Sequence, residues 1–272
     1  MSDVLQVERS GAFWFAKLNR PDKRNALSDE LVVELGSLCD RVTADLEARA
    51  LVLYGAGGNF CAGADLGGFL QLMQSEPGHA EDPIARYNRQ FGAMLERLAA
   101  LPVPSLAVVT GVAMGGGCGL ASACDRVIAA EDAVFAMPEV TLGVAPAQIA
   151  PFVIRRIGAT CARWLMVSAA RLPAAAALQA GLADRVVPAP ELRAIVEAEL
   201  RLLGSAEPAA LRATKRIINV AVDSPLPAAL DSASLEFAGL LRHGAAGEGI
   251  AATRQKRAPA WQAAVPNLPD FR

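Results

Sequence analysis

Leu106-Ala-Val-Val-Thr-Gly-Val-Ala-Met-Gly-Gly-Gly-Cys-Gly-Leu-Ala-Ser-Ala-Cys-Asp125 is the stretch that decides the fold. Its β-branched run at residues 108–110 predicts a strand, and Gly111 with the glycines at 115–117 predicts a tight turn. Residues 120–124 predict the start of a buried helix. Glycines at such a turn leave main-chain N–H groups uncovered at a helix N-terminus, where the helix dipole favours negative charge. The stretch therefore predicts a place that holds a negative oxygen.

The same glycines are compatible with two further roles. They would permit close helix packing, and the sequence alone leaves this alternative open. The uncharged segment 98–124 contains two Gly-x-x-x-Gly spacings, which are typical of membrane helices, but Pro102, Pro104 and the three glycines would break such a helix. Neither the Gly-x-Gly-x-x-Gly pattern of dinucleotide sites nor a following Lys-Ser or Lys-Thr occurs here, so nucleotide-binding loops are excluded.

Composition narrows the possible functions. The net charge of −2 argues against a nucleic-acid surface, although it allows a local basic patch for one phosphorylated ligand. Five cysteines without a C-x-x-C pair predict reduced thiols, and the first residues lack a signal sequence, so we expect a cytoplasmic protein. Only two histidines occur, His79 and His243, both predicted at the surface. A His-based metal site or a Ser-His-Asp triad is therefore not expected, and carboxylates and backbone groups must carry any catalysis.

The hydrophobic pattern along the chain predicts an α/β core followed by a helical region. A hairpin is expected first, then a helix capped by Ser28 and running to about residue 48, and then alternating strands and helices. From residue 191 onward the pattern is purely helical, so we expect a core over residues 1–200 and a helical oligomerisation region over 201–272. The expected strands are 5–9, 12–18, 50–54, 125–130, 133–137 and 184–188, and the expected later helices are 84–100, 151–158, 159–168, 174–180, 192–203, 208–222, 226–241 and 245–257. Residues 75–83 are expected to form a mobile loop.

Two acidic residues stand out because small or apolar residues surround them. Glu139 has no basic residue nearby in the sequence, and a buried glutamate without a partner is costly, so it is either exposed or kept for chemistry. Asp65 follows a glycine- and alanine-rich loop, where it is either a turn or cap residue or part of a site. The sequence alone leaves both pairs of alternatives open.

Four motifs together resemble the enoyl-CoA hydratase/isomerase family, the crotonases. They occur in the family's order and spacing, and the resemblance extends to Lys256-Arg-Ala-Pro259 near the end of the chain. The resemblance implies a crotonase-like spiral of repeated β-β-α units with a helical C-terminal trimerisation region, assembled as a homotrimer or a dimer of trimers. The motifs are Asn19-Arg-Pro-Asp-Lys-Arg-Asn-Ala-Leu27, Phe60-Cys-Ala-Gly-Ala-Asp-Leu66, Gly111-Val-Ala-Met-Gly-Gly-Gly-Cys-Gly-Leu120 and Phe135-Ala-Met-Pro-Glu139.

The resemblance also implies a site for a coenzyme A thioester. The thioester oxygen would lie between the backbone N–H groups of Ala64 and Gly116, and Glu139 would move the proton. Coenzyme A would enter only as part of the substrate, with no tightly bound cofactor and no metal. Residues implied to contact coenzyme A are Lys23, Arg24, Ala26, Ala62, Asp65, Leu66 and Lys256, the last of them from a neighbouring subunit.

One departure from the family pattern affects the expected reaction. Hydratases of this family typically carry a first glutamate on the helix after the glycines, and this chain has Gly119 there. A single glutamate suffices for double-bond isomerisation, it still permits hydration, and an inactive coenzyme A-binding member is the third alternative. Residues 144–153 are similar to a branch that includes isohexenylglutaconyl-CoA hydratase, which favours hydration. Gln148 would then orient a water or a substrate carboxylate, unless it is only a surface amide.

Overall fold

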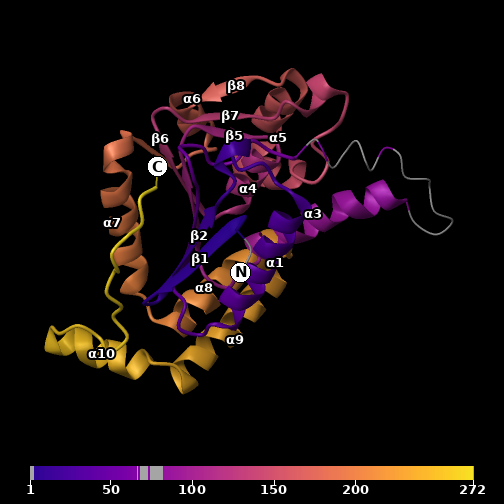
Figure 1. Cartoon of the computed structure of the whole chain (residues 1–272). Helices are drawn as coiled ribbons and strands as arrows, with labels where there is room; N and C mark the ends of the chain where they lie inside the picture. Colours follow the sequence, from indigo (N-terminus) through magenta and orange to yellow (C-terminus); the bar gives the residue numbers. More distant parts are fainter. Residues whose placement is uncertain (1–2, 66, 68–72, 74–81, 272) are drawn as a thin grey trace.

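The computed structural model describes residues 3–65, 67, 73 and 82–271, and it contains two β-sheets with helices packed around them (Figure 1). The larger sheet has the order β1-β2-β3-β4-β6-β9, with β1 and β2 antiparallel and the remaining pairs parallel. Its strands are β1 (Leu5–Ser10), β2 (Phe13–Leu18), β3 (Ala50–Gly55), β4 (Ser105–Val109), β6 (Arg126–Ala130) and β9 (Arg185–Val187). Every residue of β3 and β4 is buried, as expected for parallel strands covered on both faces.

The smaller sheet has the order β5-β7-β8 and is built from strands of three residues each. They are β5 (Val112–Met114), β7 (Val134–Ala136) and β8 (Arg171–Pro173). Helix α4 (Gly116–Ala123) begins directly after β5, and the 3₁₀ helix η2 (Glu139–Leu142) follows β7. Gly116 follows β5 and Glu139 follows β7. Because β5 and β7 are parallel neighbours, these two residues lie at the same edge of the smaller sheet.

Helices cover both faces of the larger sheet. Helix α1 (Asp29–Ala44) buries Leu31, Leu35, Leu38 and Val42 on one face, and the Ser28 hydroxyl accepts a hydrogen bond from the N–H of Leu31. Helix α3 (Pro83–Ala99) packs beside α1. The other helices are α5 (Ala150–Ser168), α6 (Ala174–Ala180), α7 (Leu192–Gly204), α8 (Pro208–Asp223), α9 (Leu226–His243) and α10 (Ala246–Gln255), with the 3₁₀ helices η1 (Pro21–Lys23) and η3 (Ala189–Glu191).

Helix α8 and the segment that follows α10 attach the C-terminal region to the core, the latter by burying Leu268 and Phe271. Lys215 is buried, and its Nζ donates to the carbonyl of Val103 and to the carboxylate of Asp125. Helix α9 lies against α8, joined by an ion pair between Arg216 and Glu236, whereas α10 extends away from the sheets at the lower left of Figure 1. The division into residues 1–200 and 201–272 falls within α7 and stays a proposal.

The expected α/β core followed by a helical region is confirmed. Some local predictions were wrong. The expected strand, turn and helix around the glycines contain an additional short strand, β5, and α4 begins at Gly116, so its first turn contains the glycines. Helix α1 ends at Ala44, before the expected residue 48, because Asp45 leaves the helical conformation and its carboxylate accepts from Arg9 and Trp14. Strand β8 was not expected.

The helices expected at 151–158 and 159–168 are separated, as predicted, by non-helical backbone at Gly158 within α5. The predicted loop at 75–83 and His79 lie almost entirely outside the described residues. Within the described part of the chain, no helix is long and apolar enough to cross a membrane.

Candidate active site

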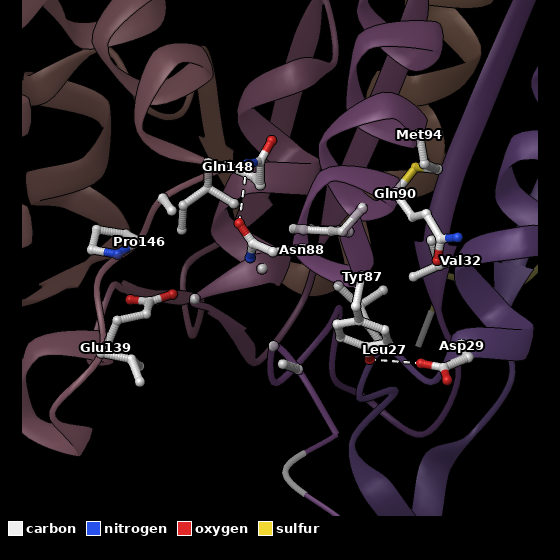
Figure 2. Close-up of a pocket in the computed structure, with 18 of the residues that line it drawn as sticks. Leu27, Asp29, Val32, Tyr87, Asn88, Gln90, Met94, Glu139, Pro146 and Gln148 are labelled. Carbon is white, nitrogen blue, oxygen red and sulfur yellow. Dashed lines mark hydrogen bonds between the residues drawn. The ribbon is translucent and has the colours of Figure 1, made fainter. Parts of the chain in front are cut away.

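A cavity of about 1190 Å³ lies between α1, α3, the start of α4 and the segment that follows β7 (Figure 2). Most of its lining is apolar. Its polar lining residues are Asp29, Tyr87, Asn88, Gln90, Arg97, Glu139 and Gln148. Of the residues predicted for the site, the cavity wall contains Ala62, Ala64, Gly116 and Glu139.

Two loops from distant parts of the sequence meet at the floor of this cavity. The N–H of Cys61 donates to the carbonyl of Val112, and the N–H of Met114 donates to the carbonyl of Cys61, each at 2.9 Å. A Cβ added to Gly63 would lie 3.5 Å from the nitrogen of Gly116. The structure therefore brings the loop around Ala64 next to the N-terminus of α4, as predicted.

The N–H groups of Ala64 and Gly116 are available in this arrangement. Their neighbours are engaged: the N–H of Asp65 donates to Leu27 at 3.0 Å, and that of Gly115 donates to Ala136 at 2.8 Å. Across the described ranges, no backbone hydrogen bond is formed by the N–H of Ala64 or of Gly116. Because Gly116 is the first residue of a fully buried helix, the partial positive charge of the helix N-terminus points into the cavity.

Close approach explains why glycines occupy this turn. A Cβ at Gly117 would lie 2.2 Å from the carbonyl oxygen of Cys61, so no side chain fits there. Gly115 has a φ of +50°, and its Cβ would lie 2.7 Å from Oε1 of Glu139. The glycines thus fit both interpretations of the sequence, because they allow tight loop packing and also admit the carboxylate of Glu139 beside the turn.

Glu139 begins η2, and its carboxylate faces the cavity (Figure 2). Its Oε2 is buried without a hydrogen-bond partner among the described residues. Burial raises the pKa of this carboxyl above its ordinary value. Of the two alternatives for Glu139, simple surface exposure does not fit, since a desolvated carboxylate with one unpaired oxygen is the state expected of a group that exchanges protons.

The other carboxylate on the cavity wall is in a different state. Asp29 accepts a hydrogen bond from the hydroxyl of Tyr87 at 2.6 Å, on the side of the cavity opposite Glu139 in Figure 2. Asp29 therefore connects the first turn of α1 to α3. Glu139 is the better candidate for proton transfer.

Ile149 fills the space in which a side chain at position 119 would lie. A Cβ added to Gly119 would be 2.2 Å from Cγ2 and 2.6 Å from Cβ of Ile149. Ile149 is only 3% exposed, so a larger side chain at position 119 could be accommodated only if Ile149 shifted. The glycine on α4 is thus matched in this chain by a branched apolar side chain before α5.

This fit leads to a prediction about restoring a second carboxylate. We expect Gly119→Glu alone to destabilise the protein by about 1–3 kcal/mol and to add no activity, because the new side chain overlaps Ile149. Gly119→Glu combined with Ile149→Ala should recover stability relative to the single variant. Denaturant unfolding of the two variants measures this difference, and equal stabilities would show that Ile149 does not limit the site.

The residues predicted to contact coenzyme A lie around a rigid first loop. Asn25 is fully buried, and its side chain bonds the backbone of Arg20, Ala56 and Asn59. The N–H of Ala62 donates to the carbonyl of Arg24 at 2.9 Å, which places the two predicted contact segments together. Lys23 and Arg24 are exposed beside them.

Of the remaining predicted contacts, Asp65 and Lys256 lie within the described residues. The carboxylate of Asp65 pairs with Arg20 at 2.8 Å and accepts from the N–H of Gly67, which lowers its pKa, so its observed bonds are those of a turn residue. Leu66 lies outside the described residues. Lys256 follows α10 and does not line the cavity, so within one chain the structure does not bring it to the others.

Helix α3 supplies cavity residues that the sequence analysis did not identify. Phe91 touches the glycine turn, since a Cβ at Gly116 would lie 3.3 Å from its Cζ. Asn88 accepts a hydrogen bond from Gln148 at 3.0 Å. The available signal was the periodic pattern of α3, which identifies the buried face but does not show that the edge of this face borders a cavity.

The family model for enoyl-CoA hydratase/isomerase matches residues 8–264. This chain belongs to the enoyl-CoA hydratase/isomerase family. A relative in Mycobacterium bovis, named probable enoyl-CoA hydratase echA8, is 33% identical and is aligned over 94% of this chain and 97% of its own length. Enzymes of this family use coenzyme A thioesters as substrates.

Two solved structures show the same fold across nearly the whole chain. An enoyl-CoA hydratase/isomerase from Marinobacter aquaeolei has a TM-score of 0.92 and 37% identity, with 96% of this chain and 100% of that chain covered. Pseudomonas aeruginosa AtuE has a TM-score of 0.91 and 40% identity, with 95% and 99% covered. Within the described residues, no group of three or more His, Cys, Asp or Glu side chains is arranged to hold a metal ion.

Proposed function

We propose that this protein is an enoyl-CoA hydratase that adds water to a 2-enoyl-CoA thioester with Glu139 as its only acid/base. The observation that carries the proposal is the shared cavity, in which two unused N–H groups at Ala64 and Gly116 lie with an unpaired carboxylate. Relatives with names that include enoyl-CoA hydratase support hydration as the reaction.

The proposed steps use one proton carrier. The oxygen of a water molecule forms a bond to C3 of the enoyl group while Glu139 accepts the proton that the water loses. The electron pair of the double bond moves toward the thioester oxygen, which becomes an enolate oxygen held by the N–H groups of Ala64 and Gly116. Each such donor is worth about 3–4 kcal/mol in the transition state. The protonated Glu139 then returns the proton to C2, and the C2–C3 double bond has become a single bond.

Isomerisation is the second candidate, and the same groups would perform it. Glu139 would take a proton from one carbon of a 3-enoyl-CoA and return it to another through the same enolate. The single acid/base is the observation that favours this reaction. An inactive coenzyme A-binding protein is the third candidate, for which Gly119 is the support.

Turnover of two substrates separates these candidates. The protein would be incubated with crotonyl-CoA and with a 3-enoyl-CoA, and the products would be identified by mass and by comparison with standards of the two isomers. Gain of one water by crotonyl-CoA supports hydration, and conversion of the 3-enoyl-CoA to its 2-enoyl isomer without gain of mass supports isomerisation. No reaction with either thioester would overturn the proposed hydratase function for these substrates.

The pH dependence of turnover follows from the raised pKa of Glu139. The first step needs the ionised carboxylate, and burial shifts the loss of that form to higher pH than for an exposed glutamate. We therefore expect kcat/KM to fall tenfold per pH unit as the pH drops below this raised pKa. The dependence of kcat/KM on pH, measured with crotonyl-CoA as substrate, tests this expectation. A profile that stays flat down to pH 4.5 would contradict the assignment of Glu139 as base.

Coenzyme A binding and assembly complete the proposal. Lys23, Arg24, Ala26, Ala62 and Leu66 are proposed to line the path of coenzyme A, with Asp65 holding the loop and Lys256 reaching in from a neighbouring subunit. A homotrimer or dimer of trimers is proposed because α9 presents large apolar side chains to solvent, and a cytoplasmic location is proposed from the cysteine content. The exposed residues of α9 include Leu226, Leu230, Leu235, Phe237 and Leu241.

A further inference from the structure

Two side-chain amides in the cavity wall, those of Asn88 and Gln148, are hydrogen-bonded to each other. The Nε2 of Gln148, from the segment before α5, donates to Oδ1 of Asn88 on α3 at 3.0 Å (Figure 2). Both residues line the cavity and both are partly buried. Most of the surrounding wall is apolar, so these amides are among the few groups that can hydrogen-bond a bound oxygen.

The position of Gln148 depends on a glycine in the middle of α3. A Cβ at Gly92 would lie 1.9 Å from Oε1 and 2.8 Å from Cδ of Gln148. A glycine inside a helix costs about 1 kcal/mol relative to alanine. Asn88 and Gly92 are four residues apart and therefore share one face of the helix. Gly92 thus makes room for the Gln148 amide directly beside the side chain it contacts.

The hydrogen bond from Gln148 orients the Asn88 amide. Because Oδ1 is the acceptor, the Nδ2 of Asn88 carries both of its donor hydrogens on the other side. In the part of the chain that the structure describes, no hydrogen bond from this Nδ2 occurs. Figure 2 shows Asn88 and Glu139 reaching into the cavity from opposite walls. An oriented N–H donor therefore faces the same space as the proton carrier.

Contacts on both sides place this pair near the reacting atoms. Phe91, one helical turn after Asn88, approaches the Gly116 turn, as Leu27 does. Ile149, next to Gln148, fills the space beside Gly119 where the family's first carboxylate would begin. Asn88 is therefore one helical turn from a residue that contacts the Gly116 turn, and Gln148 is adjacent to the residue beside Gly119. The acyl carbons just beyond the thioester would occupy this region.

We propose that Asn88 donates a hydrogen bond from Nδ2 to the oxygen that is added at C3, with Gln148 as the positioning residue that orients it. The same oxygen belongs to water before the reaction and to the 3-hydroxyl group of the product, so Asn88 recognises both. Asn88 transfers no proton, which remains the role of Glu139. This inference rests on the proposed hydratase function.

Binding in a non-reacting variant tests the contact. In a Glu139→Gln background, the affinities for 3-hydroxybutyryl-CoA and butyryl-CoA would be measured by titration calorimetry with and without Asn88→Ala. Loss of one hydrogen bond predicts a fall of about 3- to 10-fold for the hydroxy thioester and less than twofold for butyryl-CoA. Gln148→Ala should shift the same ratio in the same direction by a smaller factor.

Kinetics with Glu139 intact give a second readout. Exchange of the C2 protons of butyryl-CoA in heavy water needs Glu139 and the two backbone donors but no added oxygen. Asn88→Ala should therefore lower kcat for hydration of crotonyl-CoA about 10-fold or more, while exchange stays within twofold. Arg86→Ala, an exposed residue of α3 outside the cavity wall, is the control and should change neither rate.

The outcomes separate this inference from the proposed function. Equal losses of hydration and exchange in Asn88→Ala, or equal losses of both affinities, would show that Asn88 only packs against the site and would overturn the inference. Unchanged hydration would overturn it as well. Absence of both hydration and exchange in the unaltered protein would instead reject the proposed function.

Discussion

Replacing Glu139 with glutamine is expected to lower kcat/KM for crotonyl-CoA hydration by about 10²- to 10⁴-fold, the usual contribution of a positioned acid/base. Glutamine has nearly the same shape, so the cavity wall and the Gly115 turn should be preserved. No other unpaired carboxylate among the described cavity residues can replace it, since Asp29 is engaged with Tyr87. Initial rates at saturating and limiting thioester concentrations measure the loss.

The same substitution should stabilise the fold, and this serves as its control. Burial raises the pKa of Glu139, so the folded state holds this proton more tightly than the unfolded chain. Ionised Glu139 therefore lowers the free energy of unfolding. This loss is absent below the ordinary pKa of 4.5, grows as the pH rises, and is complete above the raised pKa. We expect Glu139→Gln to raise Tm near pH 8 and to leave it unchanged near pH 4. An inactive variant with a lower Tm at pH 8 would mean that activity was lost through damage to the fold.

Gly116→Val is expected to abolish hydration, with a loss of at least about 10²- to 10³-fold, the cost of removing one donor to the oxyanion. A Cβ at position 116 would lie 2.8 Å from Cδ1 of Leu27 and 3.3 Å from Cζ of Phe91. These contacts should turn the first N–H of α4 away from the thioester oxygen. Because both contacts are side-chain ends, the fold should still assemble, as checked by circular dichroism.

A matched glycine elsewhere controls for the effect of valine in a helix. Gly247 on α10 has open space around its Cβ position, so Gly247→Val should leave turnover within about twofold of the unaltered protein. If Gly116→Val retains more than a tenth of the activity, the thioester oxygen is not held at this residue. A similar loss in Gly247→Val would show that the effect comes from general destabilisation.

Much of the fold follows from signals that are local in sequence. Gly11 has the positive φ that the predicted hairpin requires, Ser28 caps α1, and Gly181 ends α6 in the left-handed conformation. Strands of three residues, such as β5 and β8, carry too little pattern to be recognised. The end of α1 was misplaced because its cause, the pairing of Asp45 with Arg9, joins residues far apart in the sequence.

In the candidate site too, features that depend on neighbouring residues in the sequence were predictable, and contacts between separate elements were not. Glu139 stood out because no partner lies near it in sequence, and the glycine turn indicated where N–H groups are left free. Steric exclusion of a side chain at Gly119 by Ile149, and the meeting of Asn88 with Gln148, depend on how separate elements pack. Such contacts have no signature in the spacing of one sequence.

A lone carboxylate on one wall of the cavity also has a stereochemical consequence. The enoyl group is planar, and in the proposed hydration Glu139 alone would reach it, since Ile149 occupies the space beside Gly119. In the proposed hydration, the hydrogen at C2 and the oxygen at C3 therefore arrive on the same face of the double bond. Water labelled with deuterium would give a single diastereomer of the product, with its relative configuration set by one side chain.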